Sequence, residues 1–267
     1  MLLRPLGDGR TAVITQPAHA WLSGRLIRAW GCPPFAAPAP FDQVCFAAEN
    51  HDIGWLRWES APTPDPETGL PRNFTRMPLP THLAIWREGI DHAGHYGRYP
   101  ALLVSLHATT IYRRYFDLDA ARPEDAGRVR SFLDEQQQVQ DRLSASLQND
   151  PYCAATASAP QIEVNRLLIA AVDWMSLAMC QSPDRPASVE NVPTADGDRT
   201  SLTLTPSKDG TIAVDPWPFT RDRLETTIEC RILTGRYKDD TSLRQGLANA
   251  PRQSLPIHLR PQARERA

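Results

Sequence analysis

The sequence predicts a mainly α-helical protein: a helical bundle that carries a small antiparallel β element at its C-terminus. Apolar residues recur at helical spacing through most of the first 180 positions. Proline-rich segments at residues 32–41, 61–71 and 77–80 separate the helical stretches and are typical of rigid loops. After Cys180 the pattern changes to a partial alternation of apolar and polar residues, which favours strands.

This change of pattern predicts two domains in the 267 residues. We expect a helical domain over residues 1–183 and a β-rich extension over residues 184–267 that packs on it. Hydrophobic residues make up 41% and charged residues 22% of the chain, as in ordinary globular proteins that bury a core.

Charge and composition exclude several classes of function. The formal net charge of −2 gives no footprint for nucleic acid. The first ten residues contain no apolar run, so no signal peptide is expected, and no stretch has the ~20 apolar residues of a membrane span. Five scattered cysteines without CxxC spacing argue against a disulfide framework or a zinc ribbon. These features predict a cytoplasmic protein without nucleic-acid or membrane partners.

Local signals define the first predicted elements. Residues 9–14 are expected to form a short strand. Thr15 suits an N-cap and Pro17 a first helical turn, so a helix is expected over residues 16–30, ending at Gly31. A second helix is expected over residues 43–51, after which Gly54 would let the chain leave the helical path.

The later elements follow from periodicity and proline positions. The helix at 100–112 is apolar nearly all round and should be buried, whereas the polar one at 123–149 should be exposed. Residues 161–180 form a core helix with one charge, Asp173, in its apolar centre. The predicted helices after the second span residues 79–95, 100–112, 123–149 and 161–180, and the predicted C-terminal strands lie within residues 201–206, 211–219 and 224–237.

Residues of metal-ligand type lie on successive predicted helices. They are His19, His51, Asp52, His82, His107 and Asp173. Helical bundles build metal centres from inward-facing side chains in this way. Imidazole suits iron, zinc, manganese and cobalt, while a carboxylate adds charge and can bridge two ions.

Two divalent ions are expected, and the ligand types do not distinguish iron, manganese, zinc or cobalt. One ion would bind His19, His51, Asp52 and Asp173. The second would bind His82 and His107 and share Asp52. Few protein ligands per ion leave positions for water and substrate, with His51 and Asp52 at the reaction centre.

Each of these residues also has an ordinary structural interpretation. A single histidine on an apolar face, such as His107, is more often a hydrogen-bonded core residue, and His19 and His82 could be surface residues. Asp173 is different, because an unpaired buried carboxylate is costly. A salt bridge to Arg166, seven residues away on the same helical face, is the alternative to metal binding. The order of the six residues together favours the metal site.

The pattern resembles the HD-domain superfamily of metal-dependent enzymes, and its H…HD…H…H…D ligand order is similar to the dinuclear branch. The resemblance rests on His19, the doublet in the segment ENHDIGW, and Asp173 in AAVDWMSL, and it covers residues 15–180. It implies an HD-type helical bundle. The whole chain also looks like an uncharacterised bacterial family with an HDxGW segment, an LLVSLH helix and a VDWMSL-type helix.

Three functions remain open from the sequence. The first is a phosphohydrolase of a small phosphorylated substrate, in which arginines clamp phosphate bidentately. The candidates for substrate binding are Arg57, Arg98, Arg113, Arg114 and Trp55. The second is a di-iron oxygenase that cleaves a C–C or C–P bond, and the third is a non-catalytic metal- or ligand-binding module. Edge strands of the β element could pair two copies into a homodimer.

Overall fold

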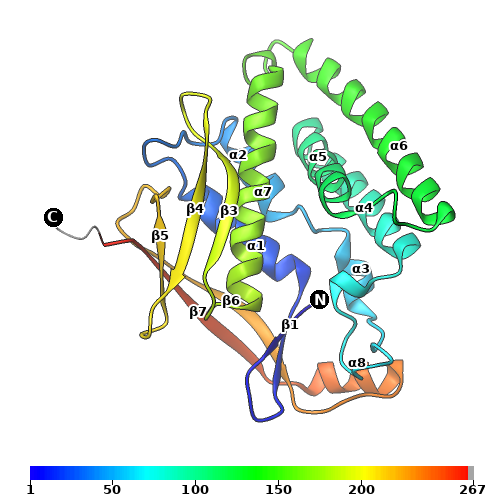
Figure 1. The fold of residues 1–267 in the computed structure, drawn as a ribbon. Helices are drawn as coiled ribbons and strands as arrows, with labels where there is room; N and C mark the ends of the chain where they lie inside the picture. Colours follow the sequence, from blue (N-terminus) through cyan, green and yellow to red (C-terminus); the bar gives the residue numbers. More distant parts are fainter. Residues whose placement is uncertain (264–267) are drawn as a thin grey trace.

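The computed structural model describes residues 1–263 as helices around one sheet (Figure 1). The α-helices are α1 (Gln16–Arg28), α2 (Phe41–Glu49), α3 (Trp55–Ser60), α4 (Leu79–Gly94), α5 (Arg98–Tyr115), α6 (Pro123–Gln148), α7 (Ala159–Gln181) and α8 (Asp240–Asn249). Two short 3₁₀ turns, η1 and η2, span Phe74–Arg76 and Ala154–Thr156. The strands are β1 (Leu2–Pro5), β2 (Thr11–Ile14), β3 (Ala187–Pro193), β4 (Arg199–Pro206), β5 (Thr211–Asp215), β6 (Leu224–Leu233) and β7 (Arg252–Pro261).

The strands form one seven-stranded mixed sheet in the order β1-β2-β6-β7-β5-β4-β3. β5 and β7 run parallel, and the other neighbours are antiparallel. The sheet curls into a half-barrel, and the chain is 48% helix and 20% strand. The predicted fold, a mainly α bundle of HD type with a small C-terminal β element, is therefore wrong.

The error has a physical reason, which is that strands from both ends of the chain join one sheet. β2 pairs with β6 through Ala12 and Ile232, so the N-terminal segment belongs to the same sheet as the C-terminal strands. β7 was not predicted, although Leu255, Ile257 and Leu259 alternate toward the core. The division after residue 183 stays a prediction, and strands from both sides of it share the sheet.

The predicted helices are confirmed, with ends that differ by a few residues. The Thr15 side chain accepts a hydrogen bond from the Ala18 backbone N–H, as an N-cap should. Ser158 caps α7 in the same way. No described helix is both long and apolar enough to pass through a lipid bilayer.

Figure 1 shows how the elements are layered, with α1 and α7 lying between the sheet and the helices α4, α5 and α6. α7 packs on β3 and α1 packs on β6. The main core joins the sheet to α1, α2, α5 and α7, and a second cluster joins α4, α5 and α6. Helices α1, α2, α5 and α7 therefore meet in the main core, and α5 also belongs to the second cluster.

Gly54 acts differently from what the sequence suggested. Its backbone is in the right-handed helical region, with φ −62°, so it provides no special turn. A Cβ at this position would lie 2.1 Å from the carbonyl oxygen of Ile85 and 2.7 Å from the backbone nitrogen of Gly89. Glycine is needed here because the segment after His51-Asp52 packs directly on the backbone of α4.

Candidate metal centre

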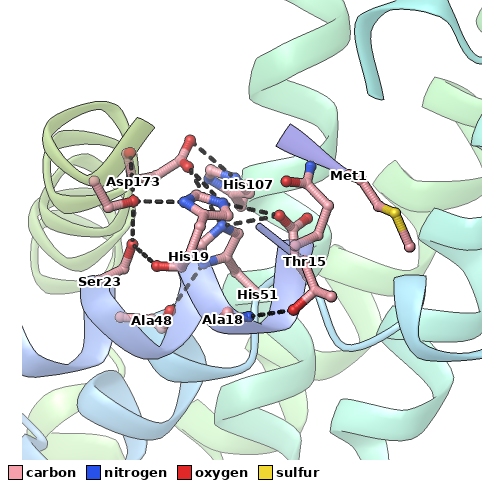
Figure 2. A network of polar contacts seen from close by, with 12 residues as sticks. Met1, Thr15, Ala18, His19, Ser23, Ala48, His51, His107 and Asp173 are labelled. Atoms are coloured by element: carbon pink, nitrogen blue, oxygen red, sulfur yellow. Dashed lines mark hydrogen bonds and ion pairs between the residues drawn. The ribbon is translucent and has the colours of Figure 1, made fainter. Parts of the chain in front are cut away.

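Five of the six predicted ligands gather in the interior. His19 lies on α1, His51 and Asp52 follow α2, His107 lies on α5 and Asp173 lies on α7. All five residues are buried. Figure 2 shows the side chains of His19, His51, His107 and Asp173 pointing toward one another.

The contacts among four of these residues have the spacing of a ligand set. Nε2 of His19 lies 3.0 Å from Oδ2 of Asp52 and 3.4 Å from Oδ1 of Asp173. Nε2 of His51 lies 3.5 Å from Oδ2 of Asp52 and 3.4 Å from Oδ1 of Asp173. One ligand atom each from His19, His51 and Asp173 lie within 4.8 Å of one another, so these three residues could hold a metal ion.

The hydrogen bond to Ser176 fixes which nitrogen of neutral His19 carries the proton. Nδ1 of His19 lies 2.5 Å from the Ser176 hydroxyl. That hydroxyl donates its single proton to the backbone carbonyl of Asp173, so it accepts from His19. Nε2 is therefore the ring nitrogen that faces the two carboxylates, and it lies within hydrogen-bond distance of Oδ2 of Asp52.

His51 is oriented by the backbone. Its Nδ1 donates to the carbonyl oxygen of Ala48 at 2.8 Å, because a carbonyl can only accept. Nε2 is buried and has no hydrogen-bond partner among the described residues. Metal-binding histidines characteristically donate their second ring N–H in this way, which fixes the ring and its tautomer.

The Nε2 atoms of two imidazoles and two carboxylates thus converge, and the two buried negative charges require positive charge between them. In the metal-free protein a proton supplies it. Burial alone would lower the pKa of His51. The negative charges of Asp52 and Asp173 outweigh burial and raise this pKa above its ordinary value, to about 9. Burial raises the pKa of Asp52 and of Asp173, yet the neighbouring histidines hold both below the ordinary value. A divalent cation would meet the same need with the same four side chains.

The salt-bridge alternative for Asp173 does not hold. Arg166 forms a bidentate pair with Glu163 one turn away, at 2.7 and 2.6 Å, and its third nitrogen donates to Thr110. The side chains within ion-pair distance of Asp173 are histidines, including His107, whose Nε2 lies 3.6 Å from Oδ2. The buried charge on α7 is therefore part of the histidine cluster.

His82 lies apart from the other five. It is half-buried, and its Nδ1 lies 2.7 Å from the Tyr112 hydroxyl. No hydrogen bond or ion pair joins it to the other predicted ligands within residues 1–263. Burial lowers the pKa of His82 and of His107 to about 4, so both rings are neutral. A second ion at His82 and His107 stays a prediction.

The sequence matches the model of one known protein family. The model of the family described as "Protein of unknown function (DUF3891)" matches residues 1–235. The chain belongs to this family. No significant match was found among curated proteins or among solved structures.

The DUF3891 match contains all six predicted ligands and ends before α8 and β7. The expectation of an uncharacterised family is therefore confirmed.

Unsatisfied polar atoms mark the same place in this DUF3891 protein. Among the described residues, seven buried side-chain nitrogen or oxygen atoms have no hydrogen-bond partner. Five of the seven belong to the neighbourhood of the cluster: His51 Nε2, His107 Nδ1, His107 Nε2, Trp55 Nε1 and Trp86 Nε1. Leaving such an atom unpaired costs about 1–3 kcal/mol, so a ligand is expected here. The orphaned imidazole nitrogens fit a divalent cation.

The predicted substrate-binding residues are dispersed. The side chain of Arg98 binds Ser146 on α6 and Asp150, which follows α6, and makes no hydrogen bond to the cluster. Arg57 is exposed on α3. Trp55 is buried, with its ring centroid 5.6 Å from that of His82.

Arginines line a cleft of about 500 Å³ between α5, α6 and α7. Arg113 and Arg114 come from the end of α5 and Arg166 from α7. Arg166 is paired with Glu163, whereas Arg113 donates to the neutral Gln137. The cleft lies along the same helices as His107 and Asp173 and has an excess of positive charge.

Sequence reasoning missed the residues that orient the ligands. Ser176 is a buried hydroxyl in an otherwise apolar stretch of α7, three positions after Asp173, and this placement was its signal. Ser23, buried on α1, donates to Ser176 at 2.9 Å. Tyr112 gave no signal, because a tyrosine near a helix end is usually a packing residue.

Proposed function

We propose that this DUF3891 protein is a metal-dependent phosphohydrolase acting on a small phosphorylated substrate. The observation that carries the proposal is the convergence of His19, His51, Asp52 and Asp173 with their basic nitrogens and carboxylate oxygens facing one another. The order of the predicted ligands resembles that of the HD superfamily, and we propose that the cluster is an HD-type site within a different overall fold.

The residues divide into those that would hold the ion and those that hold the ligands. His19, His51, Asp52 and Asp173 would bind one divalent cation. Ser176 and the carbonyl of Ala48 fix the two rings so that no reorientation is needed. When bound, the ion would supply Lewis-acid polarisation of a phosphoryl oxygen and a water of lowered pKa.

Solvent exposure and nearby positive charge bear on how a phosphorylated substrate would bind. The side chain of Asp173 is 13% exposed and that of His51 is 1% exposed, so solvent reaches the cluster at the Asp173 side. The arginine-lined cleft between α5, α6 and α7 provides positive charge suited to a phosphorylated compound.

The test uses the full chain loaded separately with Mn²⁺, Fe²⁺, Zn²⁺ or Co²⁺. We expect metal-dependent release of phosphate from p-nitrophenyl phosphate or a comparable small phosphoester. His51→Gln and Asp52→Asn should reduce the rate to background. His95→Gln is the matched control, because His95 is exposed at the end of α4, and it should retain the rate.

Two other results would replace the proposal. Two bound irons with oxygen consumption and no phosphate release from any phosphoester would show the oxygenase chemistry. Protein that binds no metal above background, with His51→Gln unchanged in stability and ligand binding, would show a non-catalytic module.

A further inference from the structure

Two orphaned atoms at the cluster cannot be explained by a metal ion. The indole nitrogens of Trp55 and Trp86 are buried without a hydrogen-bond partner among the described residues, and the two residues are 1% and 3% exposed. An indole N–H is a donor and has no lone pair for a cation. It requires an acceptor, and buried donors are rarely left without one.

The two indoles lie in one continuous group of rings with the histidines. The ring centroid of His82 is 5.6 Å from that of Trp55 and 6.0 Å from that of Trp86. Trp86 in turn lies 5.7 Å from His107, whose ring is 4.8 Å from that of His51. The two tryptophan rings therefore adjoin the histidine rings of the cluster, on the side formed by α3 and α4.

His82 can act as a third donor in this group if the Tyr112 hydroxyl donates to its Nδ1. The hydrogen bond to Nδ1 of His82 is the one partner found for the Tyr112 hydroxyl within residues 1–263. When the hydroxyl donates to Nδ1, its proton is satisfied and the proton of the neutral imidazole lies on Nε2. Nε2 makes no hydrogen bond within the same residues, so it is free to donate to a ligand. This tautomer makes His82 a donor in place of the metal ligand that the sequence suggested.

We propose that Trp55, Trp86 and His82 form a donor pocket that binds the non-bridging oxygens of a phosphoryl group beside the metal centre. The inference rests on the proposed function and names the residues that would recognise its substrate. A tetrahedral oxyanion offers only acceptors, which matches a set of neutral donors held in place by packing. Tyr112 is a positioning residue that acts through His82.

Trp30 provides an internal comparison. Its indole nitrogen is also buried and unpaired, but its ring packs between Phe35 and Phe219, in the core that faces the sheet. An orphaned indole without the pocket should therefore not respond to phosphate.

The first experiment needs no variant that must refold. Indole N–H signals of the metal-loaded, ¹⁵N-labelled full chain are followed by NMR while inorganic phosphate is added. The metal is Zn²⁺, which is diamagnetic. We expect the signals of Trp55 and Trp86 to shift with saturation and that of Trp30 to stay in place. Unshifted signals for both, or an equal response of Trp30, would overturn the proposal.

The second experiment measures phosphate affinity by calorimetry together with metal content. Trp55→Phe and Trp86→Phe each keep a ring and remove one N–H, and each should weaken phosphate binding about tenfold with metal content unchanged. His82→Phe and Tyr112→Phe should weaken it too. Trp30→Phe is the control and should bind phosphate as the unaltered chain does.

Several outcomes would contradict this assignment. Binding of phosphate unaffected by loss of both indole N–H groups would overturn it, as would preference for acetate over phosphate. A loss of bound metal in His82→Phe would return His82 to the ligand set. These results are independent of phosphoester hydrolysis, whose absence would count against the proposed function and leave the donor pocket standing.

Discussion

Nε2 of His51 lies 3.4 Å from Oδ1 of Asp173, and no hydrogen bond from another side chain competes for that nitrogen among the described residues. The contact joins the loop after α2 to the middle of α7. The predicted ligands therefore come together only when these two segments pack against each other. A substitution of Asp173 alone should disrupt the set.

Replacement of Asp173 should remove the metal. Asp173→Asn keeps the shape of the side chain but removes the negative charge that faces His19 and His51. We expect a loss of metal affinity greater than the roughly 10–100-fold that follows loss of an outer-shell partner. Elemental analysis and calorimetric titration measure it.

The matched control for this substitution is Glu163→Gln. Glu163 also lies on α7, but it pairs with Arg166 away from the cluster. It should bind metal normally. Unchanged metal content in Asp173→Asn would refute the metal centre described here.

Ser176 should set the affinity through His19. Ser176→Ala removes the acceptor of the Nδ1 proton, so the ring loses the bond that fixes its tautomer. Metal binding should weaken roughly 10–100-fold without unfolding. Ser105→Ala, which removes a buried hydroxyl bonded to Gln136 on α6, should leave metal affinity unchanged. Equal effects of the two variants would show a general loss of stability instead.

Metal binding should depend on pH through His51. Because the pKa of His51 is raised to about 9, the ring must release a proton to bind a cation at pH 7. Affinity should therefore rise with pH up to about 9. Titrations in two buffers of different ionisation enthalpy measure the proton released, and His51→Gln should abolish the proton release from this ring.

The same shifts predict the stability of the metal-free protein. A raised histidine pKa stabilises the folded state below the ordinary value of 6.5, and this contribution is lost as pH rises toward 9. Because the pKa values of Asp52 and Asp173 are lowered, these carboxylates stabilise the folded state above pH 3.8, their ordinary pKa. This contribution is lost as the pH falls below 3.8. The melting temperature without metal should therefore be highest between these limits, and a maximum above pH 9 would contradict the proton's role in the cluster.

Gly54→Ala should destabilise the fold. The added Cβ would meet the backbone of α4 at Ile85 and Gly89, which cannot yield as a flexible side chain can. Overpacking of this kind costs about 1–3 kcal/mol, measurable by chemical denaturation. Gly127→Ala on α6 has open space around it and should be neutral or stabilise by about 0.4–1 kcal/mol. Equal stability of the two variants would contradict the close approach.

The helices could be predicted because their signals are local. Thr15 and Pro123 each mark a helix start within a few residues of the observed one. The sheet could not be predicted in the same way, because the partner of β2 is β6, at the other end of the chain. Alternation identifies a strand but not its neighbour, so the sequence predicts the C-terminal strands as a separate element.

The candidate site was predictable where burial makes a residue type costly. Asp173 in an apolar helix required a partner, and the structure provides histidines. The sequence could not show which ring nitrogen of His19 or His82 carries the proton. That choice depends on the hydroxyls of Ser176 and Tyr112, which come from other helices. The contact of Arg98 with Asp150 could not be predicted either, because the two residues are far apart in the sequence.

The position of β7 between β6 and β5 has a consequence for synthesis of the chain. Until residues 252–261 have left the ribosome, the other six strands form two unconnected pieces, β1-β2-β6 and β5-β4-β3. The helices that carry the six predicted ligands are complete by Gln181, well before the sheet can close. The ribosome therefore synthesises the predicted ligands first. It synthesises β7, the strand that joins the two pieces of the sheet, after the other six strands.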